Sequence, residues 1–266
     1  MIRMVALDID GTLLAPGVDT LAVPDAAMTE AVHNLHEAGI VVVLATGRMY
    51  PGTLHIAKHL NIDQPLICQQ GASVHNFDGT LRHGCAIEPE IALELIDYAA
   101  SHGWPLAWFD SIRYLVTSDS PAARFFADVS QVKMEIHPEP QASGVRPTGI
   151  DIISTREISP EVHVLLEARY GARITLLDFP GVTAVHAPDA SKGNAVTQLA
   201  RELGITLDEV LAIGDSVNDV SMLSVAGHSA APAHCDRYAR ESADEILTGE
   251  GVSGVTSRLR ELLDAT

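Results

Sequence analysis

The first third of the chain alternates short apolar runs with amphipathic helical patterns. The apolar runs at 4–9, 40–45 and 65–68 have the length and composition of strands buried on both faces. Between the first two runs, Pro24-Asp25 opens a pattern of apolar residues at helical spacing, and Gly39 stands where a helix C-cap would. This rhythm of strand, helix, strand, helix and strand predicts an α/β core with a parallel sheet and right-handed crossovers.

The pattern changes near residue 84. A turn at Asp78-Gly79 predicts a hairpin, and the next hundred residues mix helical stretches with paired strands such as "LAWF" and "IRYLVT". The helices of this stretch are expected around 89–102, 120–128 and 159–169. Such a mixture predicts an inserted α+β domain with a small core of its own.

After Pro188 the core rhythm returns. A helix is expected at 192–203, a strand at 209–215 and a further helix near Asn218, and "SAAPA" and "DEIL" are candidates for the last strands. The expected fold is a Rossmann-like parallel-sheet core with helices on both faces, plus the inserted domain. The predicted divisions are a first core part, the insertion and a second core part, at 1–83, 84–187 and 188–266.

Composition narrows the range of partners. The 266 residues include 17 basic and 35 acidic side chains, a formal net charge of -18, which opposes binding to nucleic acid or an anionic membrane. No apolar run approaches the ~18 residues of a membrane span, and the N-terminus lacks the pattern of a signal peptide. The three cysteines show no framework. A cytoplasmic protein with free thiols is expected, and its oligomeric state stays open.

Polar side chains follow three of the predicted strands. Asp8 and Asp10 follow the first strand, and residues i and i+2 of an extended chain point the same way. Two such carboxylates repel each other unless a cation lies between them or one is protonated. Asp215 and Asp219 follow a later strand. Four carboxylates from two strand ends form a ligand set suited to Mg²⁺.

Two further segments suit an anion. Thr46, Gly47 and Arg48 follow the second strand and supply a hydroxyl, a flexible backbone and a guanidinium. Lys192 begins a predicted helix, and beside the acidic residues it becomes a natural partner for a substrate phosphate. Each short segment alone also fits an ordinary loop, cap or surface position.

Taken in order, "DIDGT", "TGR", the lysine of "SKGNAV" and "GDSVND" resemble the four motifs of the haloacid dehalogenase superfamily of phosphohydrolases. The placement of the insertion between the second and third motifs resembles the Cof-type branch, in which a large α/β cap covers the core. One departure is Gln70-Gly71-Ala72, where that branch usually has asparagine first.

The resemblance implies a role for each matched residue. Asp8 would be the nucleophile that forms an aspartyl-phosphate, and Asp10 the general acid and then the general base. Thr46, Gly47, Lys192 and Asn218 would hold or position the phosphate. Mg²⁺ would be bound by Asp8, Asp215 and the backbone carbonyl of Asp10, and Asp219 would support the metal directly or through water. Arg48 would contact substrate or shape its loop.

The favoured function is a Mg²⁺-dependent phosphatase of small phosphomonoesters, with sugar phosphates or related metabolites as the expected substrates. One alternative is a phosphotransferase or mutase that passes the phosphoryl group to a sugar hydroxyl. Another is a non-enzymatic phospho-acceptor module, since such domains also cluster aspartates, a threonine and a lysine on a parallel sheet. The inserted domain and Asp10 favour the enzyme.

Overall fold

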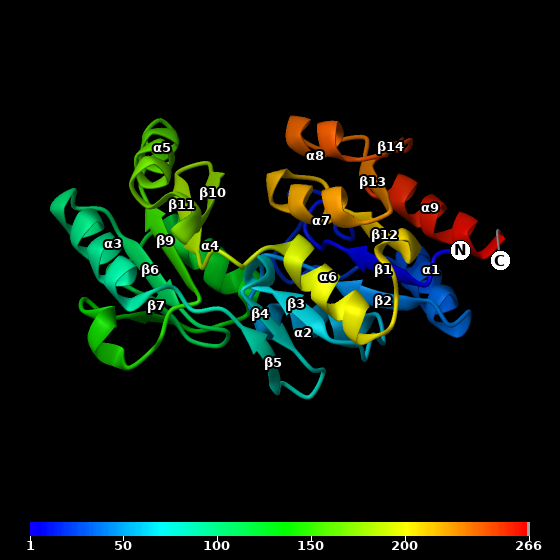
Figure 1. Cartoon of the computed structure of the whole chain (residues 1–266), viewed down its shortest axis with the longest axis horizontal. Coiled ribbons are helices and arrows are strands. Elements are labelled where there is room, and N and C mark those ends of the chain that lie inside the picture. The colour runs from blue at the N-terminus through cyan, green and yellow to red at the C-terminus, as the bar shows by residue number, and fades with distance from the viewer. Residues whose placement is uncertain (265–266) are drawn as a thin grey trace.

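The computed structural model describes residues 1–264, which form two lobes, each built on its own β-sheet (Figure 1). The core lobe holds a five-stranded sheet in the order β14-β13-β12-β1-β2, and every neighbouring pair is parallel. Its strands are β1 (Met4–Leu7), β2 (Val41–Leu44), β12 (Val210–Ile213), β13 (His228–Pro232) and β14 (Glu245–Leu247). The parallel pairing follows from the crossover helices that connect the strands.

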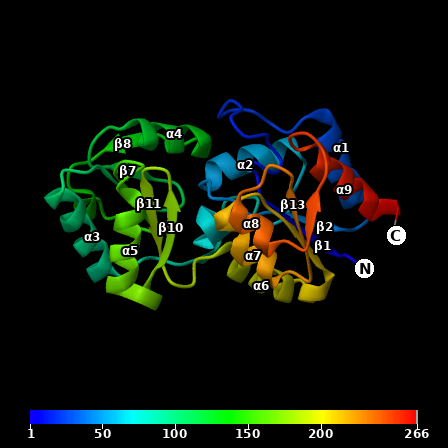
Figure 2. The ribbon, with the colours of Figure 1, turned by 90° about the horizontal axis from the view of Figure 1, so that it is seen from above.

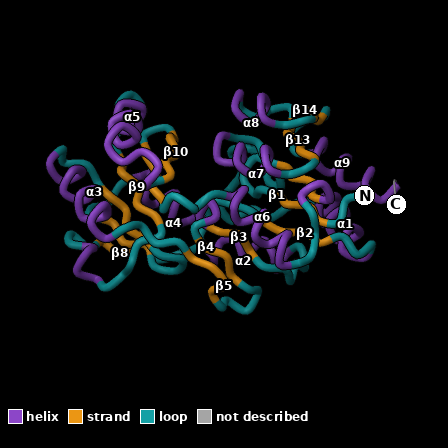
Figure 3. Tube along the Cα trace, in the orientation of Figure 1, coloured by secondary structure: helices purple, strands orange, loops and turns teal. Residues whose placement is uncertain are grey.

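Helices cover both faces of the core sheet (Figure 3). On β1, Val5 and Leu7 pack with α1 (Ala26–Glu37), α2 (Tyr50–His59) and α9 (Ser253–Asp264), whereas Met4 and Ala6 pack with the helices on the opposite face. Those helices are α6 (Lys192–Glu202), α7 (Val220–Val225) and α8 (Arg237–Ser242). Because β1 is apolar on both faces, it lies inside the sheet between β12 and β2, and its carboxyl end is held firmly.

A small antiparallel sheet extends the core lobe toward the second lobe. It contains β3 (Leu66–Cys68), β4 (Ser73–His75) and β5 (Leu81–Gly84). A single parallel bridge between Ala45 and Ile67 joins it to the end of β2. The expected hairpin is present, with its turn at Asp78-Gly79 between β4 and β5.

The second lobe is a cap domain built on a six-stranded sheet in the order β10-β11-β9-β6-β7-β8. The strands are β6 (Leu106–Phe109), β7 (Tyr114–Val116), β8 (Met134–Ile136), β9 (Gly149–Ile153), β10 (Thr175–Phe179) and β11 (Val182–His186). The helices α3 (Pro89–Ser101) and α5 (Ser159–Tyr170) cover one face, and α4 (Pro121–Ser130) packs at the other. Figure 2 shows α4 and the sheet face beside the core.

The structure confirms the predicted fold class of a parallel-sheet core with an additional cap. The three cap helices lie within two residues of the expected ranges. The domain boundaries at 84 and 187 stay predictions. One local difference lies near Asn218, where a short 3₁₀ turn (Val217–Asp219) precedes α7. Over residues 1–264, no helix is both long and apolar enough to span a membrane.

Candidate active site

The polar segments singled out in the sequence meet at the carboxyl ends of the core strands. A cavity of about 550 Å³ lies there between the core and the cap. Its core wall is lined by Asp8, Asp10, Thr46, Gly47, Arg48, Asp215 and Asn218. These residues come from three separate segments, which the parallel order of β2, β1 and β12 places at one edge of the sheet.

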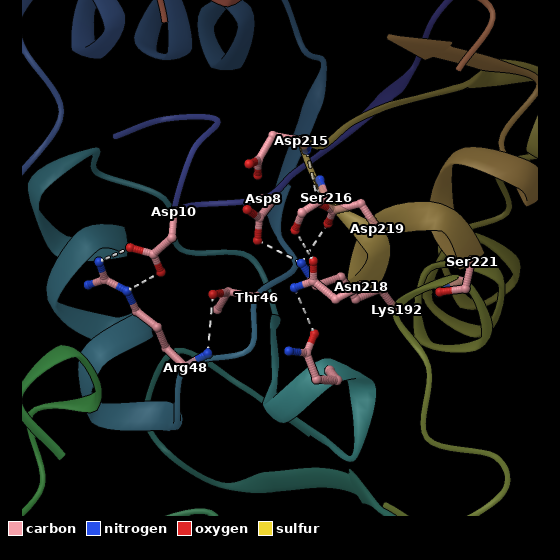
Figure 4. A network of polar contacts seen from close by, with 12 residues as sticks. Asp8, Asp10, Thr46, Arg48, Lys192, Asp215, Ser216, Asn218, Asp219 and Ser221 are labelled. Carbon is pink, nitrogen blue, oxygen red and sulfur yellow. Dashed lines mark hydrogen bonds and ion pairs between the residues drawn. The ribbon is translucent and has the colours of Figure 1, made fainter. Parts of the chain in front are cut away.

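Lys192 links two of the aspartates. It occupies the first position of α6, where Ser191 caps the helix, and its side chain is 0% exposed. The Nζ atom donates to Asp8 Oδ1 and to Asp219 Oδ1, each at 2.6 Å. Figure 4 shows the ammonium between these carboxylates. Burial would lower the pKa of Lys192, but the charges of Asp219 and Asp8 outweigh burial and raise it, so the lysine stays protonated.

Asp219 also fixes the loop that follows β12. Its Oδ2 atom accepts hydrogen bonds from the backbone N–H groups of Asp215 at 2.9 Å and Ser216 at 3.0 Å. One carboxylate therefore serves both Lys192 and a turn of backbone. Gly214 is needed beside it, because a Cβ atom there would lie 2.3 Å from Asp219 Cγ.

Three carboxylates gather closely enough to hold a metal ion. Oxygen atoms of Asp8, Asp215 and Asp219 all lie within 4.8 Å of one another. Burial and the neighbouring acids Asp219, Asp215 and Asp10 raise the pKa of Asp8 well above its usual range, against the opposing effect of Lys192. Burial, then the charge of Asp219, raises the pKa of Asp215 to about 7.

This cluster fits a hard divalent cation. Three carboxylates against one ammonium leave an excess of two negative charges when all are ionised. Asp215 Oδ1 is buried and has no hydrogen-bond partner among residues 1–264. A buried carboxylate oxygen without a donor is costly, and a cation at this point would remove that cost. Oxygen ligands of this type are those that Mg²⁺ prefers.

Asp10 has a different partner from Asp8. Arg48 Nε donates to Asp10 Oδ2 at 2.8 Å and Nη2 donates to Oδ1 at 2.6 Å, a bidentate ion pair. The Asp10 side chain is 52% exposed, whereas the Arg48 side chain is 2% exposed. Asp10 therefore lies on the cavity wall, outside the three-carboxylate cluster, and its turn toward Arg48 is visible in Figure 4. This side-chain placement is compatible with the expectation that only its backbone carbonyl would reach a metal.

The remaining predicted residues line the opposite side of the cluster. Thr46 is buried, and its Oγ1 atom accepts from the backbone N–H of Arg48 at 3.2 Å. Asn218 Nδ2 donates to Gln70 Oε1 at 3.1 Å. A Cβ atom on Gly47 would lie 2.4 Å from Gln70 Nε2, so glycine is required there for close approach. Gln70 thus connects two of the predicted phosphate-binding segments.

Several residues of the site were not selected from the sequence. Gln70 departs from the family pattern in the sequence, and the sequence gives Arg48 no definite partner. The loop after β13 also supports the site: His234 Nε2 donates to the Gly11 carbonyl at 2.7 Å, and Asp236 Oδ2 accepts from the Val217 N–H at 2.8 Å. The sequence signal for this loop was only a run of polar residues after a strand.

Comparison with known proteins places the chain in a family. The model of the haloacid dehalogenase-like hydrolases matches residues 5–259. An HMP-PP phosphatase of Cronobacter sakazakii is 27% identical over 229 residues, 85% of this chain and 82% of that protein. The phosphatase YwpJ of Bacillus subtilis is 26% identical over 288 residues, 98% of this chain and 100% of that protein.

Solved structures share the fold. A haloacid dehalogenase-like hydrolase from Bacteroides thetaiotaomicron has a TM-score of 0.86 at 20% identity, covering 98% of this chain and 100% of that one. A HAD/COF-like hydrolase from Plasmodium vivax has a TM-score of 0.85 at 23% identity, covering 100% of this chain and 96% of that one. The chain therefore belongs to the haloacid dehalogenase-like hydrolases.

Proposed function

We propose that this protein is a Mg²⁺-dependent phosphatase that hydrolyses small phosphomonoesters through an aspartyl-phosphate on Asp8. The observation that carries the proposal is the contact of one buried ammonium, Lys192, with Asp8 and Asp219 beside the orphan oxygen of Asp215. This arrangement holds Asp8 at the end of a rigid strand, on the wall of a cavity large enough for a small ester.

The proposed ion would be held by Asp8, Asp215 and Asp219, with the Asp10 carbonyl as a further ligand. When bound, Mg²⁺ would offset the repulsion between Asp8 and the phosphate and stabilise negative charge on the transferring group. Lys192 would supply a positive charge to the same end, and Thr46 and Asn218, which line the cavity, would donate hydrogen bonds to phosphate oxygens.

The chemistry divides into two displacements. In the first, a carboxylate oxygen of Asp8 attacks phosphorus, the bond from phosphorus to the ester oxygen breaks, and Asp10 gives a proton to the leaving alcohol. In the second, a water molecule attacks the phosphorus while Asp10 takes a proton from that water. The bond from phosphorus to Asp8 then breaks, which releases inorganic phosphate and restores the carboxylate.

Phosphate release from p-nitrophenyl phosphate tests this proposal. The purified protein is expected to be inactive in EDTA and active when Mg²⁺ is restored. Asp8→Asn should lower kcat by about a thousandfold or more, because the nucleophile is lost. Asp63→Asn, at an exposed aspartate between α2 and β3, is the matched control and should keep full activity.

Acid quenching during turnover should trap a phosphoryl group on Asp8. Substantial activity of Asp8→Asn, or equal activity in EDTA, would show that the proposal is wrong. A stable phosphoaspartate without turnover would favour the phospho-acceptor module, and transfer to added sugars in place of water would favour the phosphotransferase.

A further inference from the structure

The cap wall of the cavity is largely apolar. Its lining includes the rings of Phe109, Tyr114, Phe126 and Phe179, with aliphatic side chains from β9 and β11 between them. The opposite face of the cap sheet packs against α3 and α5. A substrate that places its phosphate beside Asp8 must therefore present its leaving group to this aromatic wall.

One carboxylate interrupts the apolar wall. Asp151 lies in the middle of β9, a strand that reads "GIDII". Ile150 and Ile152 point into the cap core, and Asp151 points to the other face, where it lines the cavity. Its register neighbours on both sides are alanines, Ala107 on β6 and Ala184 on β11, so small side chains flank the carboxylate.

Asp151 has no side-chain partner in the described part of the chain. It is only 7% exposed, yet no hydrogen bond or ion pair reaches its carboxylate from any residue between 1 and 264. Burial alone raises its pKa to about 7. A buried acid without a partner destabilises a fold. For stability alone, an apolar residue would be more favourable than aspartate at position 151, between its two alanine neighbours. The position makes sense if a ligand supplies the missing partner.

A second hydrogen-bond acceptor lies on the same face. His186 Nδ1 donates to the Thr148 carbonyl at 3.0 Å, and burial lowers the pKa of His186 to about 4, so the ring is neutral and Nε2 carries a lone pair. His186 is two residues from Ala184, the register partner of Asp151, and it also lines the cavity. Gly149 makes room for both rings, since a Cβ atom there would lie 2.4 Å from Phe109 Cε2 and 3.0 Å from His186 Cε1.

We propose that Asp151 recognises the leaving group of the substrate, and that this group is a flat, mainly apolar body that carries a protonated amino nitrogen. The inference rests on the proposed phosphatase function and adds the class of substrate. A carboxylate and a neutral imidazole nitrogen both accept hydrogen bonds, so the matching ligand must donate. A cation gains most from a desolvated carboxylate, and aromatic walls favour a flat ring.

This proposal departs from the sugar phosphate favoured by the sequence. The hydroxyl groups of a sugar need many polar partners when they are buried. The cap wall offers Asp151, His186 and the Tyr114 hydroxyl among rings and aliphatic side chains. Most hydroxyls of a bound sugar would lose their hydrogen bonds to water there and gain no protein partner. A ring with a single charged nitrogen has only one polar group to satisfy, and Asp151 would satisfy it.

The test uses esters that differ only in the amino group. Phosphate release in Mg²⁺ is measured for benzyl phosphate, its 3- and 4-aminomethyl derivatives, and glucose 6-phosphate. The wild-type protein should prefer at least one aminomethyl ester over benzyl phosphate by about tenfold or more in kcat/KM. Asp151→Asn should bring this ratio near one.

The matched control is Asp97→Asn, at an exposed aspartate on α3, which should leave every ratio unchanged. The inference is overturned if benzyl phosphate is hydrolysed but neither the amino group nor Asp151 affects the rate, or if glucose 6-phosphate is preferred by both proteins. If the wild-type protein hydrolyses no ester, including p-nitrophenyl phosphate, the phosphatase proposal itself fails and the inference fails with it.

Discussion

Arg48 holds Asp10 by two hydrogen bonds, at 2.8 and 2.6 Å, from a guanidinium that is almost fully buried. The loop after β1 thereby gains a fixed position for a carboxylate that is itself half exposed. In the proposed reaction Asp10 moves a proton to and from the reacting oxygen, so its orientation matters as much as its charge.

Arg48→Lys tests this positioning role. Lysine keeps the positive charge but cannot form the bidentate pair, so Asp10 should sample more orientations. We expect kcat to fall by about tenfold to a hundredfold with little change in KM, because a positioning residue acts on the chemical step. Steady-state kinetics with p-nitrophenyl phosphate measure both constants. An unchanged kcat would mean that the ion pair only shapes the loop.

Gly11 is expected to be essential to the metal site. Its φ is +91°, and a Cβ atom would lie 2.2 Å from Asp215 Oδ2. Gly11→Ala should displace the Asp215 carboxylate and raise the Mg²⁺ concentration needed for half-maximal activity by about tenfold or more.

The control for Gly11→Ala is Gly39→Ala at the end of α1. Gly39 also has a positive φ, +79°, but no atom lies within 4 Å of its would-be Cβ. Both variants carry a similar backbone strain of about 1–2 kcal/mol, so only the contact with Asp215 separates them. Equal Mg²⁺ dependence in the two variants would contradict the role given to Gly11.

Lys192 should stabilise the fold as well as the reaction. Lys192→Met leaves the buried carboxylates of Asp8 and Asp219 facing each other without their shared cation. Breaking a buried ion pair in this way costs about 3–5 kcal/mol. Urea unfolding in EDTA at neutral pH should show that loss, and Lys58→Met, at an exposed lysine of α2, should show almost none. Similar unfolding midpoints for the two variants would refute the stabilising role of Lys192.

Much of the core fold was predictable because parallel strands buried on both faces leave continuous apolar runs. The run "MVAL" of β1 is fully buried and pairs on both sides, as its composition predicts. The helices expected after Pro24-Asp25 and from Lys192 are present, and in the structure Asp25 and Ser191 each accept a hydrogen bond from a backbone N–H in the first turn. The 3₁₀ turn before α7 was not predictable from the sequence, because it depends on the hydrogen bonds that Asp219 accepts from the loop backbone.

The sequence predicted which residues form the site, but not which of them contact one another. Charged residues that follow buried strands stand out in the sequence, which is how Asp8 and Asp215 were selected. The partner of Asp10 lies 38 residues away and that of Asn218 lies 148 residues away, so only the fold assigns them. Asp151 carried the same signal, an acid inside an apolar strand, within a cap where no residue had been given a role.

The last prediction concerns the stability cost of Asp151. Its pKa is about 7 in the folded protein against an ordinary value of 3.8, with burial as the cause. Between these pH values the unfolded chain ionises this carboxyl while the folded chain keeps it protonated. Ionisation therefore favours the unfolded state, and stability is lost as the pH rises from about 4 to about 7. Asparagine cannot ionise, so Asp151→Asn should be the more stable protein, by about 2 kcal/mol at pH 5 and by about 4 kcal/mol at pH 8.

Urea unfolding of the wild type and Asp151→Asn at the two pH values measures this difference, and comparison at each pH cancels the titration of Tyr114, His186 and the other groups that both proteins share. Asp97→Asn, at an exposed position, should show no such dependence. A stability gain that is equal at pH 5 and pH 8 would mean that the Asp151 carboxyl is not held neutral by burial. A gain that grows with pH would show a carboxyl that costs the free protein stability, as expected of a group whose partner arrives with the substrate.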